Sequence, residues 1–366
     1  MIQIKDIIRE LELLAPPSYQ ESYDNAGLLV GSHETSVTGA LLSLDVTEEI
    51  VEEAIQKNCN LIVAHHPIVF KGLKKLNGKN YVERTVIKAI KNDIAIYAIH
   101  TNLDHVATGV NWEIANRLGL KNIKVLAPKK QLLMKLTFFA PTESTQAILD
   151  ILFAAGAGKI GKYENCSFRT EGTGTFLPGE SANPTIGQDG RLEEVHEHRC
   201  EVMFPSHLTN DIVTALLKSH PYEEVAYYLT ALENENQEVG AGAVGELSEA
   251  LPVEKFLELL KVSMNVTLVK YTESANKMIR RIAVCGGAGS FLLPDAIRNK
   301  ADAFVTADYK YHEFFDAENK IMICDIGHYE SEVFTKNLLH NYLSGKFPNF
   351  ALCLSDVNTN PVRYFV

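Results

Sequence analysis

Apolar runs alternate with amphipathic segments along most of the chain. The first third predicts helices from apolar residues at helical spacing and strands from short, continuous apolar runs. The predicted helices are 2–14, 47–58, 81–92 and 110–118, with Thr47 as an N-cap, and the predicted strands are 38–45, 60–65 and 94–99. Such alternation is typical of βαβ units and of a largely parallel sheet covered by helices on both faces.

The order of elements changes after Pro128 and changes back near residue 240. Between these points the pattern predicts strands at 132–139, 197–204 and 223–232, two short strands near 165–177, and helices at 143–154 and 207–218. This order suits a small ferredoxin-like α+β module, and the polar run 233–238 predicts its exit linker. The α/β alternation then resumes, with strands at 280–285, 302–306 and 321–325 and helices at 253–263 and 328–342.

We therefore predict an α/β protein in which one domain is split by another. Residues 1–127 and 240–366 form the two halves of a three-layer α/β/α domain, and residues 131–235 form an inserted α+β domain. The insert of roughly 100 residues lies within the usual size range of domains.

The composition is that of an ordinary globular protein with an acidic balance. Hydrophobic residues make up 46% of the 366 positions and charged residues 22%, which excludes the disordered and fibrous classes. The formal net charge of −11 argues against non-specific binding to nucleic acid or anionic membranes, although it is compatible with a local basic groove.

Targeting signals and paired cysteines are missing from the sequence. No apolar run reaches the ~18 residues of a membrane span, and charges fall where a signal peptide needs its apolar core. The six cysteines form no C-x-x-C pair and are typical of reduced thiols. We expect a cytoplasmic protein with no membrane partner.

The most informative motif is LIVAHHP, in which His65 and His66 follow a buried strand and precede Pro67. Ligands of open α/β sheets bind at the carboxyl ends of the strands, and neutral imidazoles there can bind a transition metal. Adjacent residues of a strand point in opposite directions, so two ions, or a twist in the loop, would be needed to use both. The alternative is a pair of histidines satisfied by backbone carbonyls, and this motif alone does not decide between them.

The next predicted strand ends in a similar way, in IAIYAIHTNLDH. It is followed by His100, Asp104 and His105. Because sequential βαβ strands are usually neighbours, Asp104 is expected beside the two histidines of the preceding strand. An isolated aspartate in such a place is more often a helix or turn cap.

A third strand end lies far along the chain, in IMICDIGHYESEVF. The strand is predicted to end at Asp325, Gly327 allows a sharp turn, and a helix begins near His328. His328 and Glu332 are four residues apart, so both project from one face of the first helical turn. Taken alone, an acidic residue near a helix N-terminus is equally explained by the helix dipole.

The convergence of these three strand ends favours a metal centre. We expect them to meet at one edge of one sheet, bringing together His65, His66, Asp104, His328 and Glu332. Five ligands are too many for a closed structural zinc site. They suit two ions, about 3.5–4 Å apart, bridged by a carboxylate and by water. Glu332 is the expected bridging carboxylate.

LIVAHHP, YAIHTNLD and DIGHYESE together resemble the motifs of the NIF-three-like family, whose members are often labelled GTP cyclohydrolase 1 type 2 homologues. The resemblance covers both α/β halves, and VCGGAGS (284–290) and TADYKYHE (306–313) match in style. The segment 131–235 resembles the extra domain of the longer bacterial members, which is similar to PII and CutA-type folds.

The resemblance implies that the five residues named above bind two divalent metal ions per subunit. It further implies a toroidal homohexamer, with the metal sites facing an internal cavity and the inserted domains capping it. Mixed nitrogen and oxygen ligands fit several metals, so zinc is expected first, with iron and manganese as alternatives.

Weaker signals have two interpretations each. VCGGAGSFLLP follows a strand and opens a helix, so its backbone amides are able to hold a phosphate. It lacks the G-x-G-x-x-G spacing and the Gly-Lys-Ser/Thr of a P-loop, which favours a tight strand–helix turn instead. His312 is either an acid/base near the metals or a surface histidine, and His100 is a candidate for orienting a ligand. His196 and His198 are expected to face solvent. No catalytic acid or base is assigned.

Two classes of function remain. The first is a dinuclear metal hydrolase of a small molecule, which the family label narrows to cyclohydrolysis of the nucleotide GTP, with water attacking the purine imidazole carbon and formate released. The H-x-E…P-C-x-x-C deaminase signature is absent from the sequence, which excludes that route. The second is a metal-loaded hexameric binding or regulatory assembly with little turnover.

Overall fold

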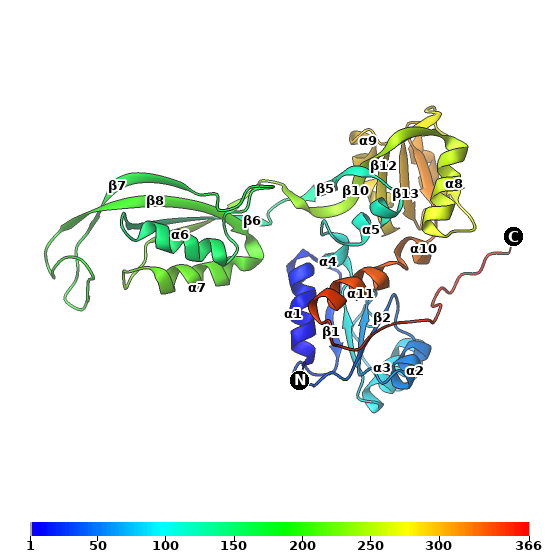
Figure 1. Cartoon of the computed structure of the whole chain (residues 1–366), viewed down its shortest axis with the longest axis horizontal. Helices are drawn as coiled ribbons and strands as arrows, with labels where there is room; N and C mark the ends of the chain where they lie inside the picture. The colour runs from blue at the N-terminus through cyan, green and yellow to red at the C-terminus, as the bar shows by residue number, and fades with distance from the viewer. Residues whose placement is uncertain (1, 366) are drawn as a thin grey trace. The chain divides into compact units, whose positions relative to one another are not determined.

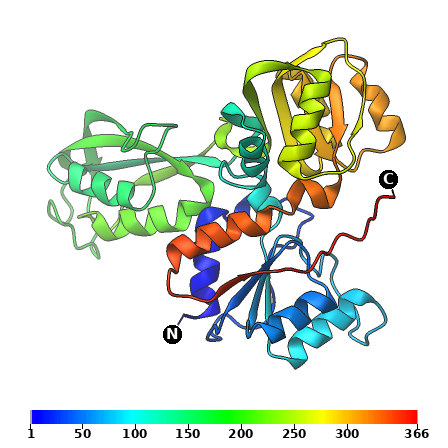
Figure 2. The same cartoon turned by 45° about the vertical axis from the view of Figure 1, so that its right-hand side comes forward.

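The computed structural model describes residues 2–365, shown from two sides in Figures 1 and 2. The chain divides into two compact units. The first joins the segments before residue 128 and after residue 237, and the second comprises residues 128–237. The expected mixed α/β class is confirmed. Among residues 2–365, no helix combines the length and apolar character needed to cross a membrane.

The first unit contains a five-stranded sheet in the order β1-β4-β3-β2-β15. Its strands are β1 (Gly27–Val30), β2 (Ala40–Ser43), β3 (Leu61–Ala64), β4 (Ala95–Ala98) and β15 (Leu352–Leu354). All are parallel except β1, which is antiparallel to β4. Figure 1 shows helices on both faces, with α2 (Glu48–Gln56) and α3 (Tyr81–Lys91) on one side and α1 (Ile4–Leu14) and α11 (Thr335–Lys346) on the other.

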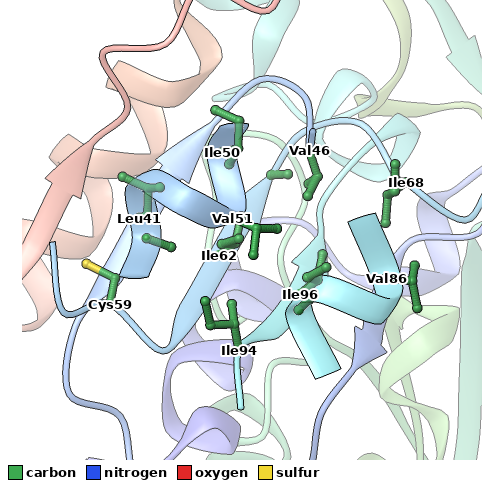
Figure 3. Close-up of a cluster of buried hydrophobic side chains, with 13 residues drawn as sticks. Leu41, Val46, Ile50, Val51, Cys59, Ile62, Ile68, Val86, Ile94 and Ile96 are labelled. Carbon is green, nitrogen blue, oxygen red and sulfur yellow. The ribbon is translucent and has the colours of Figure 1, made fainter. Parts of the chain in front are cut away.

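The apolar spacing of strands and helices produces one core of this sheet. Ile62 and Ile96 face each other on adjacent strands, and Ile50, Val51 and Val86 cover them from α2 and α3 (Figure 3). All five side chains are buried. This packing holds the carboxyl ends of β3 and β4 side by side, as the sequence predicts.

A second sheet in the same unit has six strands in the order β11-β14-β13-β12-β10-β5. They are β5 (Lys121–Lys129), β10 (Asn236–Pro252), β11 (Lys270–Tyr271), β12 (Met278–Ala288), β13 (Ala303–Ala307) and β14 (Met322–Asp325). β12, β13 and β14 are parallel, whereas β10 and β11 pair antiparallel with β12 and β14. The accompanying helices are α8 (Val253–Met264), η3 (Ser290–Leu292), α9 (Leu293–Arg298) and η4 (Tyr311–Ala317).

Four short helices complete this unit. They are η1 (Pro17–Tyr19), α4 (Thr101–Asp104), α5 (Val110–Arg117) and α10 (His328–Glu332). α4 follows β4, α10 follows β14, and both α5 and α10 pack against β12. The strand ends that carry candidate ligands are therefore each followed by a short helix or a turn.

The expectation of a single sheet is wrong. β3 and β4 lie in the five-stranded sheet, but β14 lies in the six-stranded one, where the 17-residue strand β10 pairs with β12. The candidate ligands thus come from two sheets rather than from one edge of one sheet. Apolar periodicity marks a strand but does not identify the neighbour with which it pairs.

Several element boundaries also differ from the prediction. Strands β1, β5, β10, β11 and β15 were not predicted, and the first of them is only half-buried along its length. The two strands expected near 165–177 are one strand, and the helix expected at 328–342 is broken into α10 and α11. β10 begins at Asn236, inside the predicted linker. Thr47 caps α2 as predicted, accepting a hydrogen bond from the Ile50 amide.

The second unit is an antiparallel four-stranded sheet in the order β7-β8-β6-β9. Its elements are β6 (Leu133–Pro141), α6 (Thr145–Ala154), β7 (Phe168–Phe176), β8 (Glu193–Pro205), η2 (Ser206–Leu208), α7 (Thr209–Ser219) and β9 (Tyr227–Leu232). Phe138, Cys200 and Phe204 pack with Leu149 and Leu216 of the helices, so α6 and α7 cover one face of the sheet (Figure 1).

Deleting residues 131–235 and joining the ends with a short Gly/Ser linker is expected to leave a soluble, folded first unit. The strands on either side of the deletion, β5 and β10, are neighbours in one sheet, so a short linker can join them. The apolar clusters of both sheets draw their residues from outside 131–235. A cooperative thermal melt together with metal content checks this, and insolubility at every linker length tried contradicts it.

Candidate metal centre

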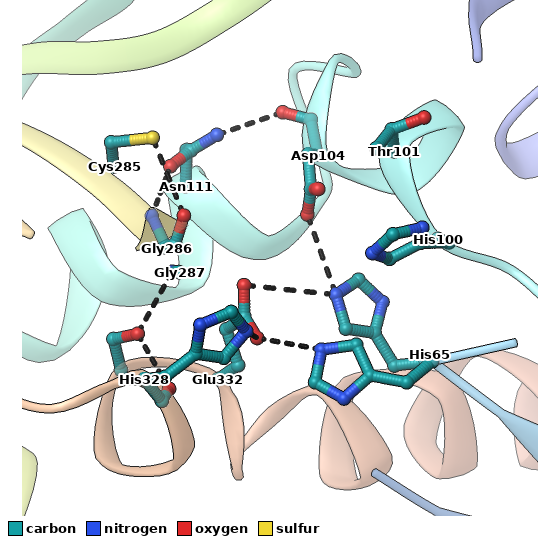
Figure 4. Close-up of polar contacts among 12 residues, drawn as sticks. His65, His100, Thr101, Asp104, Asn111, Cys285, Gly286, Gly287, His328 and Glu332 are labelled. Atoms are coloured by element: carbon teal, nitrogen blue, oxygen red, sulfur yellow. Dashed lines mark hydrogen bonds and ion pairs between the residues drawn. The ribbon is translucent and has the colours of Figure 1, made fainter. Parts of the chain in front are cut away.

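His65 and His66 lie just beyond the end of β3. Their ring centroids are 4.9 Å apart. His66 Nε2 lies 2.9 Å from Oε2 of Glu332, and His65 Nε2 lies 3.9 Å from Oε1. The strict alternation of a strand does not apply to them, because both follow the end of β3, and a twist in the loop was one of the two arrangements that the sequence left open. They approach one carboxylate, each on a different oxygen, and Figure 4 shows His65 beside Glu332.

Each imidazole near Glu332 is held through its other nitrogen, Nδ1. His65 donates to the Ile99 carbonyl at 2.8 Å. His66 donates to Asp45 and His328 donates to Asp308, both at 2.7 Å. This arrangement leaves Nε2 of all three rings directed at Glu332, as is typical of histidines that bind a metal.

Glu332 is deeply buried, with 3% of the residue exposed. It lies on α10, and His328 Nε2 approaches its Oε2 at 3.1 Å. Two glycines of the VCGGAGS segment make room for it: a Cβ at Gly287 would lie 2.6 Å from Oε1, and one at Gly286 3.4 Å. Gly287 also has φ +60°, which disfavours other residues.

The amides of the same glycines are already used. Gly286 N donates to Asn111 and Gly287 N donates to Ser331, both at 2.9 Å. The glycine-rich segment is therefore a tight turn that packs against Glu332, which is the interpretation that its spacing favoured. These two amides do not form a phosphate cradle.

Asp104 and His65 present two buried atoms to each other without a hydrogen bond. Asp104 Oδ1 and His65 Nε2 are 3.6 Å apart, which exceeds hydrogen-bond length, and neither has a partner among the described residues. Leaving a buried polar atom unpaired costs about 1–3 kcal/mol. A divalent cation between them satisfies both atoms, so the residues present fit a metal.

The protonation of the cluster follows from its buried charges. Burial lowers the pKa of His66, but hydrogen bonds to Asp45 and Glu332 raise it to about 10. Burial likewise opposes a charged His328, but Glu332 and Asp308 raise its pKa to about 9. Burial raises the pKa of Asp104 to about 7, and the charge of Glu332 adds to the effect. Burial also raises the pKa of Glu332, but the surrounding imidazoles hold it well below its usual value.

All five predicted ligands meet in one place. Three overlapping groups have ligand atoms within 4.8 Å of one another, and two of these groups share Glu332. They are His65–His66–His100, His66–His328–Glu332 and His65–Asp104–Glu332. Nitrogen and oxygen donors in such a mixture suit zinc, iron or manganese.

His100 joins the cluster through a residue that the sequence did not single out. Asp24 accepts a hydrogen bond from His100 Nδ1 at 2.8 Å and from the Thr101 amide at 3.0 Å. Burial opposes its charge, but the hydrogen bonds from His100 and from the Thr101 hydroxyl lower the pKa of Asp24 to about 2. Nothing in the local sequence of Asp24 signals this contact.

Asp45 and Asp308 were also missed, although each follows the end of a strand, β2 or β13. Their position after a strand end was the sequence signal that could have identified them.

The remaining histidines lie outside the cluster. His105 is buried, with Nδ1 donating to the Tyr19 carbonyl at 2.8 Å. His312 is exposed on η4, where its ring lies beside Tyr311, so the surface interpretation holds. His196 is exposed as expected, but His198 is half-buried and its Nδ1 lies 3.0 Å from Thr145 Oγ1.

Two cavities border the cluster. The smaller, of about 210 Å³, is lined by Tyr23, His100, Asp104, Phe291, His328 and Glu332, among others. The larger, of about 580 Å³, is lined by Asp45, His66, Lys270, Asp308, His328 and Tyr364, among others. A small molecule can therefore approach the cluster from two directions, on the side of His66 and His328 and on the side of Asp104 and Glu332.

The two sheets and the histidine–carboxylate cluster between them define a mixed α/β protein with a candidate metal site. The family model described as Duf34/NIF3 (NGG1p interacting factor 3) matches residues 2–361, and the chain belongs to this family. The family resemblance stated from the motifs is confirmed.

Curated relatives match over nearly the whole chain. A protein of Halalkalibacterium halodurans named GTP cyclohydrolase 1 type 2 homolog is 39% identical over 363 residues, covering 98% of each chain. A Bacillus subtilis protein of the same name is 36% identical over 365 residues, again covering 98% of each.

Solved structures have the same fold. A Bacillus cereus protein related to NIF3 has a TM-score of 0.89 at 36% identity, covering 100% of this chain and 99% of that one. The Staphylococcus aureus protein SA1388 has a TM-score of 0.79 at 32% identity, with the same coverage.

Metal binding is expected to release protons and to strengthen as the pH rises from about 6 to 8. A bound metal needs neutral imidazole nitrogens, whereas the pKa values of His66, about 10, and His328, about 9, keep both protonated over that range. Zinc titration calorimetry in buffers of different ionisation enthalpy should give about two protons released per chain at neutral pH. An affinity independent of pH, with no proton release, contradicts this protonation scheme.

Proposed function

We propose that this chain is a metal-dependent hydrolase of the GTP cyclohydrolase 1 type 2 kind, with two divalent ions per subunit. The ligands would be His65, His66, Asp104, His328 and Glu332. The observation that carries the proposal is the buried Glu332 carboxylate, which three imidazoles approach. Beside it, two buried polar atoms lack hydrogen-bond partners among residues 2–365.

The division of the ligands around Glu332 supports two ions rather than one. Oε1 lies on the side of His65, whose unpaired Nε2 also lies 3.6 Å from Asp104. Oε2 lies 2.9 Å from His66 and 3.1 Å from His328. One oxygen thus belongs to each half of the cluster. A carboxylate shared in this way offsets the repulsion between two dications, which is large at short range.

Zinc is the metal we propose first, with iron or manganese as alternatives, because all three accept imidazole and carboxylate donors. When bound, such ions would supply Lewis acidity and generate a nucleophile from water near neutral pH.

The protein's own groups supply the remaining chemistry. Asp45 and Asp308 hold His66 and His328 in place, and the Ile99 carbonyl holds His65. Asp24 fixes His100 through Nδ1, so Nε2 of His100 is the nitrogen that would exchange a proton with a substrate in the small cavity. Cyclohydrolysis consumes two waters. His100 would take a proton from the first water as it attacks the imidazole carbon and return it to the purine nitrogen whose bond to that carbon breaks, which leaves a formamide. A second water would attack the formyl carbon, and its proton would pass to the other nitrogen as formate is released.

A basic loop beside the cluster supports a phosphate-bearing substrate. Residues 67–82, which follow His66 directly, carry four lysines and no acidic residue in a chain of net charge −11. Lys71, Lys74 and Lys75 line a cavity of about 490 Å³ together with Phe70 and with Glu83, whose carboxylate is occupied by hydrogen bonds from the Asn77 and Lys79 amides. The Phe70 ring centroid is 6.2 Å from that of His100. This loop therefore provides positive charge for nucleotide phosphates next to the candidate ligands.

The proposal includes the assembly and the location that the resemblance implies. We infer a cytoplasmic homohexamer acting on a small molecule, with residues 131–235 as an inserted PII/CutA-like domain. The resemblance of the three motifs and of the insert supports this part of the proposal.

Glu332→Gln is expected to lower the metal content at both positions. The substitution keeps the size of the side chain and removes the shared charge, so the fold should survive while two ions per chain fall below one. His65→Ala should empty mainly one position and leave about one ion per chain. Mass-spectrometric metal analysis of wild type and both variants, with thermal melts as the folding control, tests this. Two tightly held ions in Glu332→Gln would show that Glu332 does not bridge.

The activity is tested by formate release from GTP by the purified, metal-loaded chain. Release should be catalytic, lost on chelation, and restored by adding the metal back. Guanosine, which lacks the phosphates that the lysine loop would bind, should be a poorer substrate. Stoichiometric metal without formate release would contradict the hydrolase and favour a metal-loaded binding or regulatory assembly.

A further inference from the structure

The second unit contains a cavity that is unrelated to the metal centre. It has a volume of about 430 Å³, within the range of small-molecule sites. Strand alternation places it on the sheet face opposite α6 and α7. Phe138 and Cys200 face the helices, whereas Phe139 and Glu197, which line the cavity, have the opposite orientation.

The walls of the cavity are mostly apolar. Phe139, Phe176 and the ring of Tyr222 form part of them, and residues 177–186 close over the top. The rings of Phe176 and Tyr222 are tilted, with centroids 6.1 Å apart. Thr185 Oγ1 donates to the Pro221 carbonyl at 2.7 Å and the Asn183 amide donates to Glu223 at 2.9 Å. These bonds fasten the covering loop to the opposite rim.

A buried carboxylate lies in this apolar wall. Glu197 is 9% exposed, and its Oε1 accepts a hydrogen bond from the Tyr222 hydroxyl at 2.9 Å. A Cβ at Gly174 would lie 2.1 Å from Oε2, so the glycine of β7 provides the space that this carboxylate occupies. The neighbouring residues therefore provide both a hydrogen-bond donor and the space for the Glu197 carboxylate.

No cationic side chain pairs with Glu197 among residues 2–365, and the cavity lining contains neither lysine nor arginine. The nearest titratable base, His220, uses both nitrogens as a neutral imidazole. Its Nε2 donates to the Phe139 carbonyl at 2.8 Å, and its Nδ1 accepts from the Tyr222 amide at 3.1 Å. Burial lowers the pKa of His220, which agrees with the neutral form. Glu223 and Glu224 add further negative charge to the rim.

A buried negative charge in an apolar, aromatic cavity calls for a positive partner. We propose that this cavity binds a small organic ammonium ion that has an aromatic or branched aliphatic body. The ammonium group would pair with Glu197, and the body would pack against Phe139, Phe176 and Tyr222. Ammonium groups are also attracted to aromatic faces, which the tilted pair of rings provides.

The proposal can be tested with three indole compounds of similar size and different charge. Isothermal titration calorimetry of the full-length protein at neutral pH would use tryptamine, a cation, tryptophol, which is neutral, and indole-3-propionate, an anion. We expect saturable, one-to-one binding of tryptamine, and at least tenfold weaker binding of the other two. No saturable binding of tryptamine, or equal binding of all three compounds, overturns the proposal.

Two variants and a matched control locate the site. Glu197→Gln keeps the acceptor for Tyr222 and removes the charge, and should weaken tryptamine binding at least tenfold. Ala226→Phe fills the cavity from its lining and should do the same without altering the buried carboxylate. Glu194→Gln, on the same strand but outside the lining, makes the same change in net charge and should leave the Kd unchanged.

An equal loss of binding in Glu194→Gln would indicate general electrostatics and overturn the site. If Glu197→Gln fails to fold, Ala226→Phe alone decides, since unchanged tryptamine binding in that variant would place the ligand elsewhere. The zinc content of all variants should equal that of wild type, because the cavity shares no residue with the metal cluster.

Discussion

The enclosure of Glu332 is the constraint on which most of this structure depends. A carboxylate that is 3% exposed is costly unless its charge is matched, and three imidazoles approach it. Those imidazoles are held in turn by Asp45, Asp308 and the Ile99 carbonyl, so the arrangement extends into both sheets. The backbone is constrained as well, because a Cβ atom at position 287 would collide with the Glu332 carboxylate, so this position requires glycine.

The cluster joins the two sheets of the first unit, and its two sequence halves also share both sheets through β5 and β15. His65 and His66 follow β3 of one sheet, whereas His328 and Glu332 follow β14 of the other. Neither sheet carries the cluster alone. The C-terminal segment also links the two sequence halves of this unit, because Glu53 on α2 accepts hydrogen bonds from the Ser355 hydroxyl and from the Asp356 amide. A site built between two sheets can be lined from both, which accounts for cavities on two sides of the candidate ligands.

The sequence predicted the parts of this fold that local physics determines. Continuous apolar runs identified β3, β4 and β14. The histidines and carboxylates that directly follow these strands identified the residues of the cluster. The sequence did not predict that β14 belongs to a second sheet, because β14 pairs with β13 and β11, and an apolar run does not identify the partner of a strand. Asp24 was invisible for a similar reason: its contact with His100 spans 76 residues and depends wholly on tertiary structure. The cavity beside Glu197 could not be predicted either, because it forms only where residues 177–186 fold over the sheet.

The position of β15 has a consequence for how the chain reaches its native state during synthesis. Residues 352–354 complete the five-stranded sheet by pairing with β2, whose residues are made more than 300 positions earlier. Until residues 352–354 leave the ribosome, that edge of β2 has no partner and is open to pairing with other chains. Residues 128–237, in contrast, are contiguous and can collapse as soon as they emerge. During synthesis, the second unit can therefore fold while the edge strand β2 of the first unit is still unpaired.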